Sequence, residues 1–248
     1  MGSVAGLERL DLLLPQLMPS VDVLMCTRGA LRTSVPPQGN TAIALRVSSG
    51  SSMMPAIGRW VLEQAASFAQ ELRQQGMADI RVHVNVSVKQ MEDDDFSAMV
   101  ENIMKNQADM QHQLIMEVTE SVFMESMNRA IASLNDLKET GFSIAMDDFG
   151  EGFSSLAQLL RLPFDSLKIS RTLIKNLGKD QRHLQYIAAI VEMMHALNLE
   201  VVAEGVETEE EWRSVGICGF DLVQGYYIAR PIRREDALAW ALRNAGHI

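Results

Sequence analysis

The segment FSIAMDDFG (residues 142–150) is a short apolar stretch that ends on two adjacent aspartates, Asp147 and Asp148. A run of this length, followed by a turn-forming glycine, is typical of a buried strand. Like charges repel each other and are costly to bury, so a cation or a proton should compensate the pair. The segment therefore predicts a strand with an acidic site at its carboxyl end.

Strand-like and helix-like segments alternate on both sides of this one. Further strands are predicted at 80–88, 113–120, 165–170, 200–208 and 221–231, and helices at 57–76, 93–107, 126–141, 154–163, 183–199, 209–219 and 234–246. Regular alternation predicts parallel strands covered by helices, and the number of units favours a closed (β/α)8-type barrel over an open sheet. At least one more strand is expected within residues 10–35. Residues 32–56 are rich in Ser, Pro and Gly and are the most loop-like part of the chain.

The composition limits the classes of partner. The 248 residues are 47% hydrophobic, enough for a substantial core, and carry a net charge of −10. Such a charge does not attract nucleic acid or an anionic membrane, so a phosphate-bearing ligand would need local cations such as metal ions. Cys26 and Cys218 have neither metal-type nor redox-type spacing, and no apolar run is long enough to span a membrane. We therefore expect a reduced, cytoplasmic setting.

Polar residues recur near the ends of the predicted strands, namely Asn85, Glu117, Asp147, Asp148, Lys168, Glu204, Glu207 and Gln224. Each alone has an ordinary explanation: Asn85 as a core amide, Glu117 and Lys168 as a buried salt bridge. In a parallel barrel these strand ends meet at one mouth, and a mouth lined by carboxylates and amides suits Mg²⁺ or Mn²⁺. An aspartate shared by two ions, as Asp147 could be, is a standard arrangement for phosphodiester hydrolysis.

Six ordered motifs sharpen this interpretation: VNVS (84–87), EVTE (117–120), DDFGEGFSSL (147–156), LPFDSLKIS (162–170), VVAEGVET (201–208) and QGYYIARP (224–231). In these motifs the chain resembles the EAL family, bacterial phosphodiesterases of cyclic di-GMP. The resemblance covers residues 57–231, whereas residues 1–56 are divergent and shortened. It implies an α/β fold, a TIM-like (β/α)8 barrel of the EAL type that usually has one strand reversed, and a single EAL-like domain over residues 1–248.

The resemblance also implies roles for individual residues. Asn85, Glu117 and Asp147 would help hold a first metal ion, and Asp147, Asp148 and Glu204 would hold a second. Lys168 would orient the attacking water, and Gln224 would contact the metal-bound water. Glu207 would steady the loop after Asp148. The residues that would contact the nucleotide are Arg32, Asn85, Asp148 and Gln224.

One ligand that the resemblance implies is missing. The family is named after a Glu-Ala-Leu triplet on an early strand, and its glutamate binds the first metal. We prefer VLMCTRGALRTSV (23–35) as the corresponding segment, with Arg28 as a cation that could neutralise the remaining carboxylates; AIALRV (42–47) is the alternative, with Ala42 at that place. No glutamate lies between Glu8 and Glu63, so the ligand is absent in either register.

Three functions follow from these residues. The first is a degenerate EAL domain without turnover, acting as a cyclic di-GMP receptor or as a module that contacts a regulatory protein partner, in which no metal need be bound. The second is an active phosphodiesterase that uses Mg²⁺ or Mn²⁺ to make the linear dinucleotide. The third is a lyase that uses Lys168 as an amine, which is disfavoured because nearby carboxylates would keep the amine charged. A homodimer is a further expectation from the family.

Overall fold

In the computed structural model, which describes residues 22–28, 41–46, 54–91, 94–105, 113–120, 127–152 and 159–244, the strands form a closed barrel in the order of the sequence. The strands are β1 (Asp22–Arg28), β2 (Thr41–Arg46), β3 (Arg81–Asn85), β4 (Leu114–Thr119), β5 (Ser143–Phe149), β6 (Ser166–Ile169), β7 (Glu200–Glu204) and β8 (Leu222–Gln224). The predicted TIM-like α/β barrel is confirmed.

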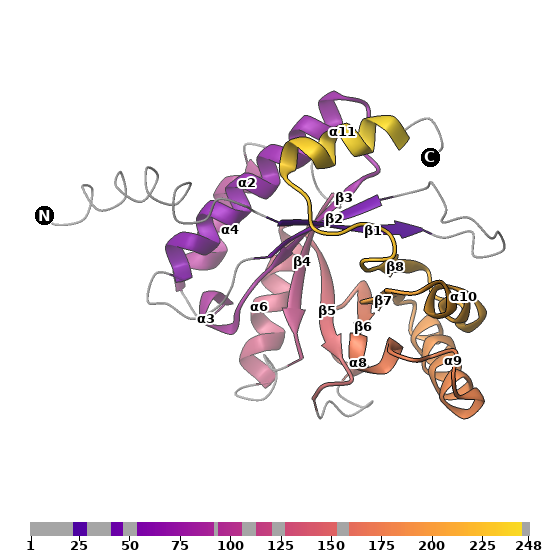
Figure 1. Cartoon of the computed structure of the whole chain (residues 1–248). Coiled ribbons are helices and arrows are strands. Elements are labelled where there is room, and N and C mark those ends of the chain that lie inside the picture. Colours follow the sequence, from indigo (N-terminus) through magenta and orange to yellow (C-terminus); the bar gives the residue numbers. More distant parts are fainter. Residues whose placement is uncertain are drawn as a thin grey trace, which may run out of the picture.

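Helices surround the barrel. They are α2 (Met54–Gln74), α3 (Val88–Met91), α4 (Asp94–Lys105), α6 (Met127–Glu139), α8 (Arg171–Ile174), α9 (Gln181–Ala196), α10 (Glu209–Cys218) and α11 (Arg234–Asn244). Figure 1 shows the strands at the centre, with α2, α4 and α6 on one side and α9 and α10 on the other. This is the covering by helices that parallel strands require.

The direction of the strands determines which ends meet. β1 is antiparallel to both of its neighbours, β2 and β8, whereas each adjacent pair from β2 to β8 is parallel. The reversed strand that the resemblance implied is therefore β1. The carboxyl ends of β2 to β8 meet at one mouth of the barrel, and β1 brings its amino end there.

Apolar packing fixes the helices on the outer surface of the barrel. On α9, the buried side chains Ile187, Ile190, Val191 and Met194 follow helical spacing and form one face. On α2, Phe68 and Leu72 are also buried in the core cluster. Inside the barrel, Val202 of β7 lies in register with Leu222 of β8, and both are buried. Each of these two residues precedes a polar site residue by two positions, on the same face of its strand.

From α2 onward the predicted elements agree with the structure, except that the short helices α3 and α8 were not predicted, and there is one error upstream. Residues 32–56 are not all loop, because β2 occupies Thr41–Arg46 and pairs on both edges, and α2 begins at Met54. The segment TAIALR is apolar enough for a strand, but Ser, Pro and Gly on both sides of it dominated the composition of the region. The strand expected within 10–35 is β1. The helix predicted at 154–163 lies largely outside the described residues.

Among the helices that the structure describes, none has the length and apolar character needed to cross a membrane.

Candidate functional site

One lysine stands at the centre of the polar mouth. Nζ of Lys168 lies 2.8 Å from Oε1 of Glu117, 3.0 Å from Oδ1 of Asp147 and 2.5 Å from Oε1 of Glu204. The lysine side chain is completely buried, and the three carboxylates are almost as deeply buried. Strands β4, β5, β6 and β7 thus bring four of the sequence-predicted residues into one cluster. The buried salt bridge between Glu117 and Lys168, considered above as the ordinary explanation, is present as part of that cluster.

The strand registers place two more predicted residues beside this cluster. Asn85 at the end of β3 is in register with Glu117, and Gln224 at the end of β8 is in register with Glu204. Nε2 of Gln224 donates a hydrogen bond to Oε1 of Glu204 over 3.3 Å. Because partners in register point to the same face of a parallel sheet, both amides belong to the mouth.

A local distortion explains how two adjacent aspartates serve one site. Neighbouring residues of a regular strand point to opposite faces. The pairing of β5 with β6 shifts register between Met146 and Phe149, and Asp148 has a φ of 56°, in the left-handed region. Such an irregularity can re-aim a side chain. The carboxylates of Asp147 and Asp148 consequently lie together.

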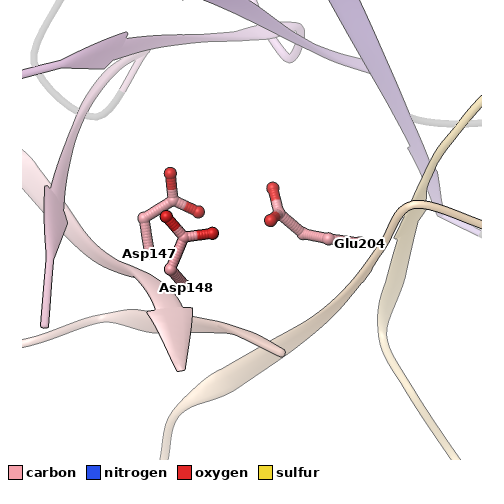
Figure 2. Close-up of side chains that lie close together, drawn as sticks. All are labelled: Asp147, Asp148 and Glu204. Atoms are coloured by element: carbon pink, nitrogen blue, oxygen red, sulfur yellow. The ribbon is translucent and has the colours of Figure 1, made fainter. Parts of the chain in front are cut away.

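Three carboxylates are arranged as a cation site. Oxygen atoms of Asp147, Asp148 and Glu204 all lie within 4.8 Å of one another. Figure 2 shows the two aspartates reaching from one strand toward the carboxylate of Glu204, which comes from another. In addition, Oε2 of Glu117 is buried and has no hydrogen-bond partner among the described residues. An all-oxygen set with a spare buried carboxylate oxygen fits Mg²⁺ or Mn²⁺.

The acidic residues of the site differ in how firmly they hold a proton. Burial alone would raise the pKa of Glu117, but Lys168 and the hydrogen-bonded His83 outweigh it and hold that pKa well below its ordinary range. Burial raises the pKa of Glu204 to about 7; Lys168 opposes this shift, whereas the charges of Asp147 and Glu117 add to it. Without a metal, Glu117 is therefore ionised at neutral pH, and Glu204 is near its midpoint.

His83 is a site residue that the sequence analysis missed. It lies on β3, its side chain is 1% exposed, and Nδ1 is 2.8 Å from Oε1 of Glu117. It stands two positions before Asn85, on the same face of the strand. A histidine in an otherwise apolar run was the available signal.

The resemblance assigned the loop after Asp148 to Glu207. Glu207 pairs with Arg171 over 2.7 Å, and both side chains are partly exposed. In the described part of that loop, the backbone N–H of Gly152 donates to Oε2 of Glu120 over 3.0 Å. Residues 153–158 lie outside the described part of the chain, so the role of Glu207 stays a prediction.

Glu211 holds the loop between β7 and α10. Its carboxylate accepts hydrogen bonds from the backbone N–H groups of Glu207, Thr208 and Asn176. Thr208 in turn accepts from the N–H of Glu211, which completes a capping box at the start of α10. The spacing Thr-x-x-Glu was the signal for this arrangement.

The structure also bears on the missing glutamate. Residues 29–40 and the side chains of β1 and β2 lie outside the described part, so nothing is established about Arg32 or about the direction of Arg28. The preferred segment 23–35 begins on β1, which runs in reverse and cannot bring its carboxyl end to the mouth. β2, in the alternative segment, runs parallel to β3, with Ala42 and Ala44 in register with Arg81 and His83. The alternative segment thus fits the direction of the strands, but Ala42 lies opposite Arg81, at the amino end of β3 and four residues before Asn85, so the place of the missing glutamate stays a prediction.

Fold and site together define a TIM-like barrel with an acidic, metal-suited mouth and one reversed strand. Comparison with known proteins gives the family: the EAL domain model matches residues 20–231, and the chain belongs to the EAL domain family.

The chain is 33% identical over 239 residues to the bifunctional diguanylate cyclase/cyclic di-GMP phosphodiesterase MucR of Pseudomonas aeruginosa. That match covers 94% of this chain but only 35% of MucR, so the chain spans about a third of that relative's length. Among solved structures, the PaMucR phosphodiesterase in complex with cyclic di-GMP matches with a TM-score of 0.78 and 28% identity, covering 94% of this chain and 99% of that one. The EAL domain of Mycobacterium smegmatis DcpA matches with a TM-score of 0.77 and 29% identity, covering 91% of this chain and 97% of that one.

Proposed function

We propose that this chain is a regulatory EAL domain of cyclic di-GMP signalling that binds the nucleotide and hydrolyses it poorly or not at all. One observation carries the proposal. β2 is the strand next to β3 that brings its carboxyl end to the mouth, and its sequence, TAIALR, contains no carboxylate. β2 therefore contributes no anionic ligand to the site beside Asn85 and Glu117.

The loss matters because hydrolysis of a phosphodiester depends on the charge and geometry of the metal cluster. A divalent cation bound at the mouth would polarise a phosphate oxygen and activate water. Removing even an outer partner of a metal ligand typically costs roughly 10–100-fold in affinity or activity, so removing a direct ligand should cost at least as much.

The remaining residues suit binding. Lys168 carries a buried positive charge at the centre of the mouth. Asp148, Asn85 and Gln224 are proposed to contact the nucleotide, and Arg32 is proposed as a phosphate donor. The relative MucR, whose structure was solved as a complex with cyclic di-GMP, shares the fold over nearly the whole of this chain.

The second candidate is an active, metal-dependent phosphodiesterase that makes the linear dinucleotide. It is favoured by the carboxylates that remain: Asp147, Asp148 and Glu204 lie within 4.8 Å of one another, and Oε2 of Glu117 is free of hydrogen bonds from described residues. In this candidate Lys168 orients the attacking water, and the cation is Mg²⁺ or Mn²⁺.

Two assays separate the candidates. The purified chain is incubated with cyclic di-GMP and Mg²⁺ or Mn²⁺, and linear product is measured by chromatography. We expect little or no product; turnover at the rate of an active EAL enzyme assayed in parallel would overturn the proposal. In the second assay, cyclic di-GMP is titrated calorimetrically into metal-free protein. Saturable heat supports the receptor, whereas no heat at high concentration leaves only the module that contacts a protein partner.

Other expectations remain proposals. They are a single EAL-like domain over residues 1–248, a regulatory protein partner, a homodimer and a cytoplasmic setting. The matched region makes up 35% of the length of MucR, which supports a regulatory module within a longer protein.

A further inference from the structure

Two aspartates join neighbouring strands in the same way, at the end of the barrel opposite the mouth. Asp221 directly precedes β8, and its Oδ2 accepts a hydrogen bond from the backbone N–H of Val201 on β7 over 2.8 Å. The backbone N–H of Asp221 donates to the carbonyl oxygen of Val201 over 3.0 Å. Asp221 therefore holds both backbone polar groups of one residue on the neighbouring strand.

Asp165 repeats this arrangement between β5 and β6. Its Oδ2 accepts from the N–H of Ile144 over 2.7 Å, and its own N–H donates to the carbonyl oxygen of Ile144 over 2.9 Å. Each carboxylate also pairs with a side chain of the helix before the first strand: Lys138 lies 2.5 Å from Asp165, and Nε2 of His195 lies 2.8 Å from Asp221. The helix contributes different side chains in the two places, so the contact to the strand is the common feature.

The contact at Asp165 stands a fixed interval before one pair of the candidate site. Asp165 precedes Lys168 by three residues. Ile144 precedes Asp147 by three residues as well. At the mouth, Nζ of Lys168 lies 3.0 Å from Oδ1 of Asp147. The aspartate thus fixes the pairing of β6 with β5 before the register shift that brings the adjacent aspartates together.

The same interval separates the contact at Asp221 from Glu204 and Gln224. Asp221 precedes Gln224 by three residues, and Val201 precedes Glu204 by three. Nε2 of Gln224 donates to Oε1 of Glu204 over 3.3 Å. Three residues of strand span about 10 Å, so Asp221 acts on this pair through the strands and not by direct contact.

The strands that follow the two aspartates are short. β6 has four residues and β8 has three. Strands of this length form few hydrogen bonds with their neighbours, so two further bonds at the starting end supply a large share of what holds the register. A slip of one residue would turn every side chain of the strand to the other face of the sheet.

We propose that Asp165 and Asp221 are positioning residues of the candidate site. Asp165 sets the register of β6 on β5, and Asp221 sets the register of β8 on β7, so that the polar side chains of each pair of strands meet at the mouth. The inference deepens the proposed function, because these residues place the same site.

A side-chain amide reports the register without metal or nucleotide. Because the amide of Gln224 donates to Glu204, its proton–nitrogen NMR signal in the metal-free full chain depends on that contact. The signal is assigned by its loss in Gln224→Ala. In Asp221→Ala we expect the signal to move by more than its line width toward that of a solvated glutamine, and the N–H of Val201 to exchange at least about tenfold faster.

Matched variants separate positioning from a general loss of stability. Asp221→Asn keeps an oxygen that can accept from Val201 and should retain the signal of the wild type. Ile187→Val weakens the buried packing of α9 without touching the strands, and should leave the signal in place. Asp165→Ala should also leave it in place, because Asp165 acts on the other pair of strands.

If Asp221→Ala does not fold, Asp221→Glu takes its place: it keeps the charge but moves the carboxylate by one methylene group, and the same displacement of the Gln224 signal is expected. An unmoved signal in Asp221→Ala or Asp221→Glu, or an equal displacement in Ile187→Val, would overturn the positioning role. These measurements use neither metal nor cyclic di-GMP. Rapid turnover of cyclic di-GMP by the wild type would therefore overturn the proposed function and leave this inference intact.

Discussion

Lys168 and Glu117 form a completely buried ion pair, with 2.8 Å between Nζ and Oε1. The pair lies at the centre of the candidate site, because the same ammonium group also contacts Asp147 and Glu204. Several carboxylates share one fixed cation here. Much of the stability of the metal-free mouth therefore depends on Lys168.

Removing that cation should be strongly destabilising. Lys168→Met keeps the length of the side chain but leaves the carboxylates unpaired, and losing one partner of a buried pair costs about 3–5 kcal/mol. Urea unfolding in the presence of a chelator measures the change. Lys138→Met is the control, because Lys138 pairs with Asp165 where both are about a third exposed, and such a pair is worth about 1 kcal/mol or less. Equal losses in the two variants would contradict this account.

The metal-free protein should lose stability as the pH rises through 7. The pKa of Glu204 is raised from 4.5 to about 7, so the folded state holds this proton more tightly than the unfolded state. The resulting stabilisation is fully present below about pH 4.5 and is lost as the pH rises through 7, by roughly 1–3 kcal/mol.

Thermal unfolding between pH 5 and pH 8 in chelator measures this effect, and Glu204→Gln should flatten the curve. Mn²⁺ affinity should rise over the same window, because the ion requires an ionised Glu204. If the stability of the wild type, but not that of Glu204→Gln, increased from pH 5 to pH 8, the prediction would be wrong.

The loop after β7 should depend on Glu211. Glu211→Ala leaves three backbone N–H groups without their acceptor, and we expect a loss of about 1–3 kcal/mol in chemical denaturation together with faster hydrogen exchange at Thr208. Glu209→Ala serves as the control, since Glu209 pairs with Arg213 on the surface and its loss should be nearly neutral. Unchanged hydrogen exchange at Thr208 would contradict the role of Glu211 in holding this loop.

The close contact between β8 and the loop after β7 should not tolerate an added methyl group. A Cβ at Gly225 would lie 2.1 Å from the backbone oxygen of Val206, which cannot move like a side chain. We expect Gly225→Ala to cost about 2 kcal/mol or more and to shift Gln224 away from Glu204. The affinity for Mn²⁺ and the free energy of unfolding should therefore both fall. A variant with the stability and affinity of the wild type would contradict this close contact.

The barrel from β3 to β8 was predictable because each strand is a short apolar run bounded by turn residues and followed by an amphipathic helix. β2 was not, because TAIALR is brief and lies among Ser, Pro and Gly, and the pairing that makes it a strand is not local in sequence.

The sequence predicts which residues form the site, but not how they contact one another. Polar residues at the strand ends identified Glu117, Asp147, Lys168 and Glu204, which the structure brings together. The hydrogen bond between His83 and Glu117 and the one from Gly152 to Glu120 depend on side-chain positions across neighbouring strands and loops. A single sequence does not specify such positions.

The central claim is that hydrolysis is limited by the carboxylate that β2 lacks. The most direct measurement is the rate of linear product formation from cyclic di-GMP and Mn²⁺ by the wild type, with an active EAL enzyme that has the glutamate assayed in parallel. We predict a rate at least about tenfold lower for this chain. A wild type that turns over as fast as the active enzyme would contradict the claim.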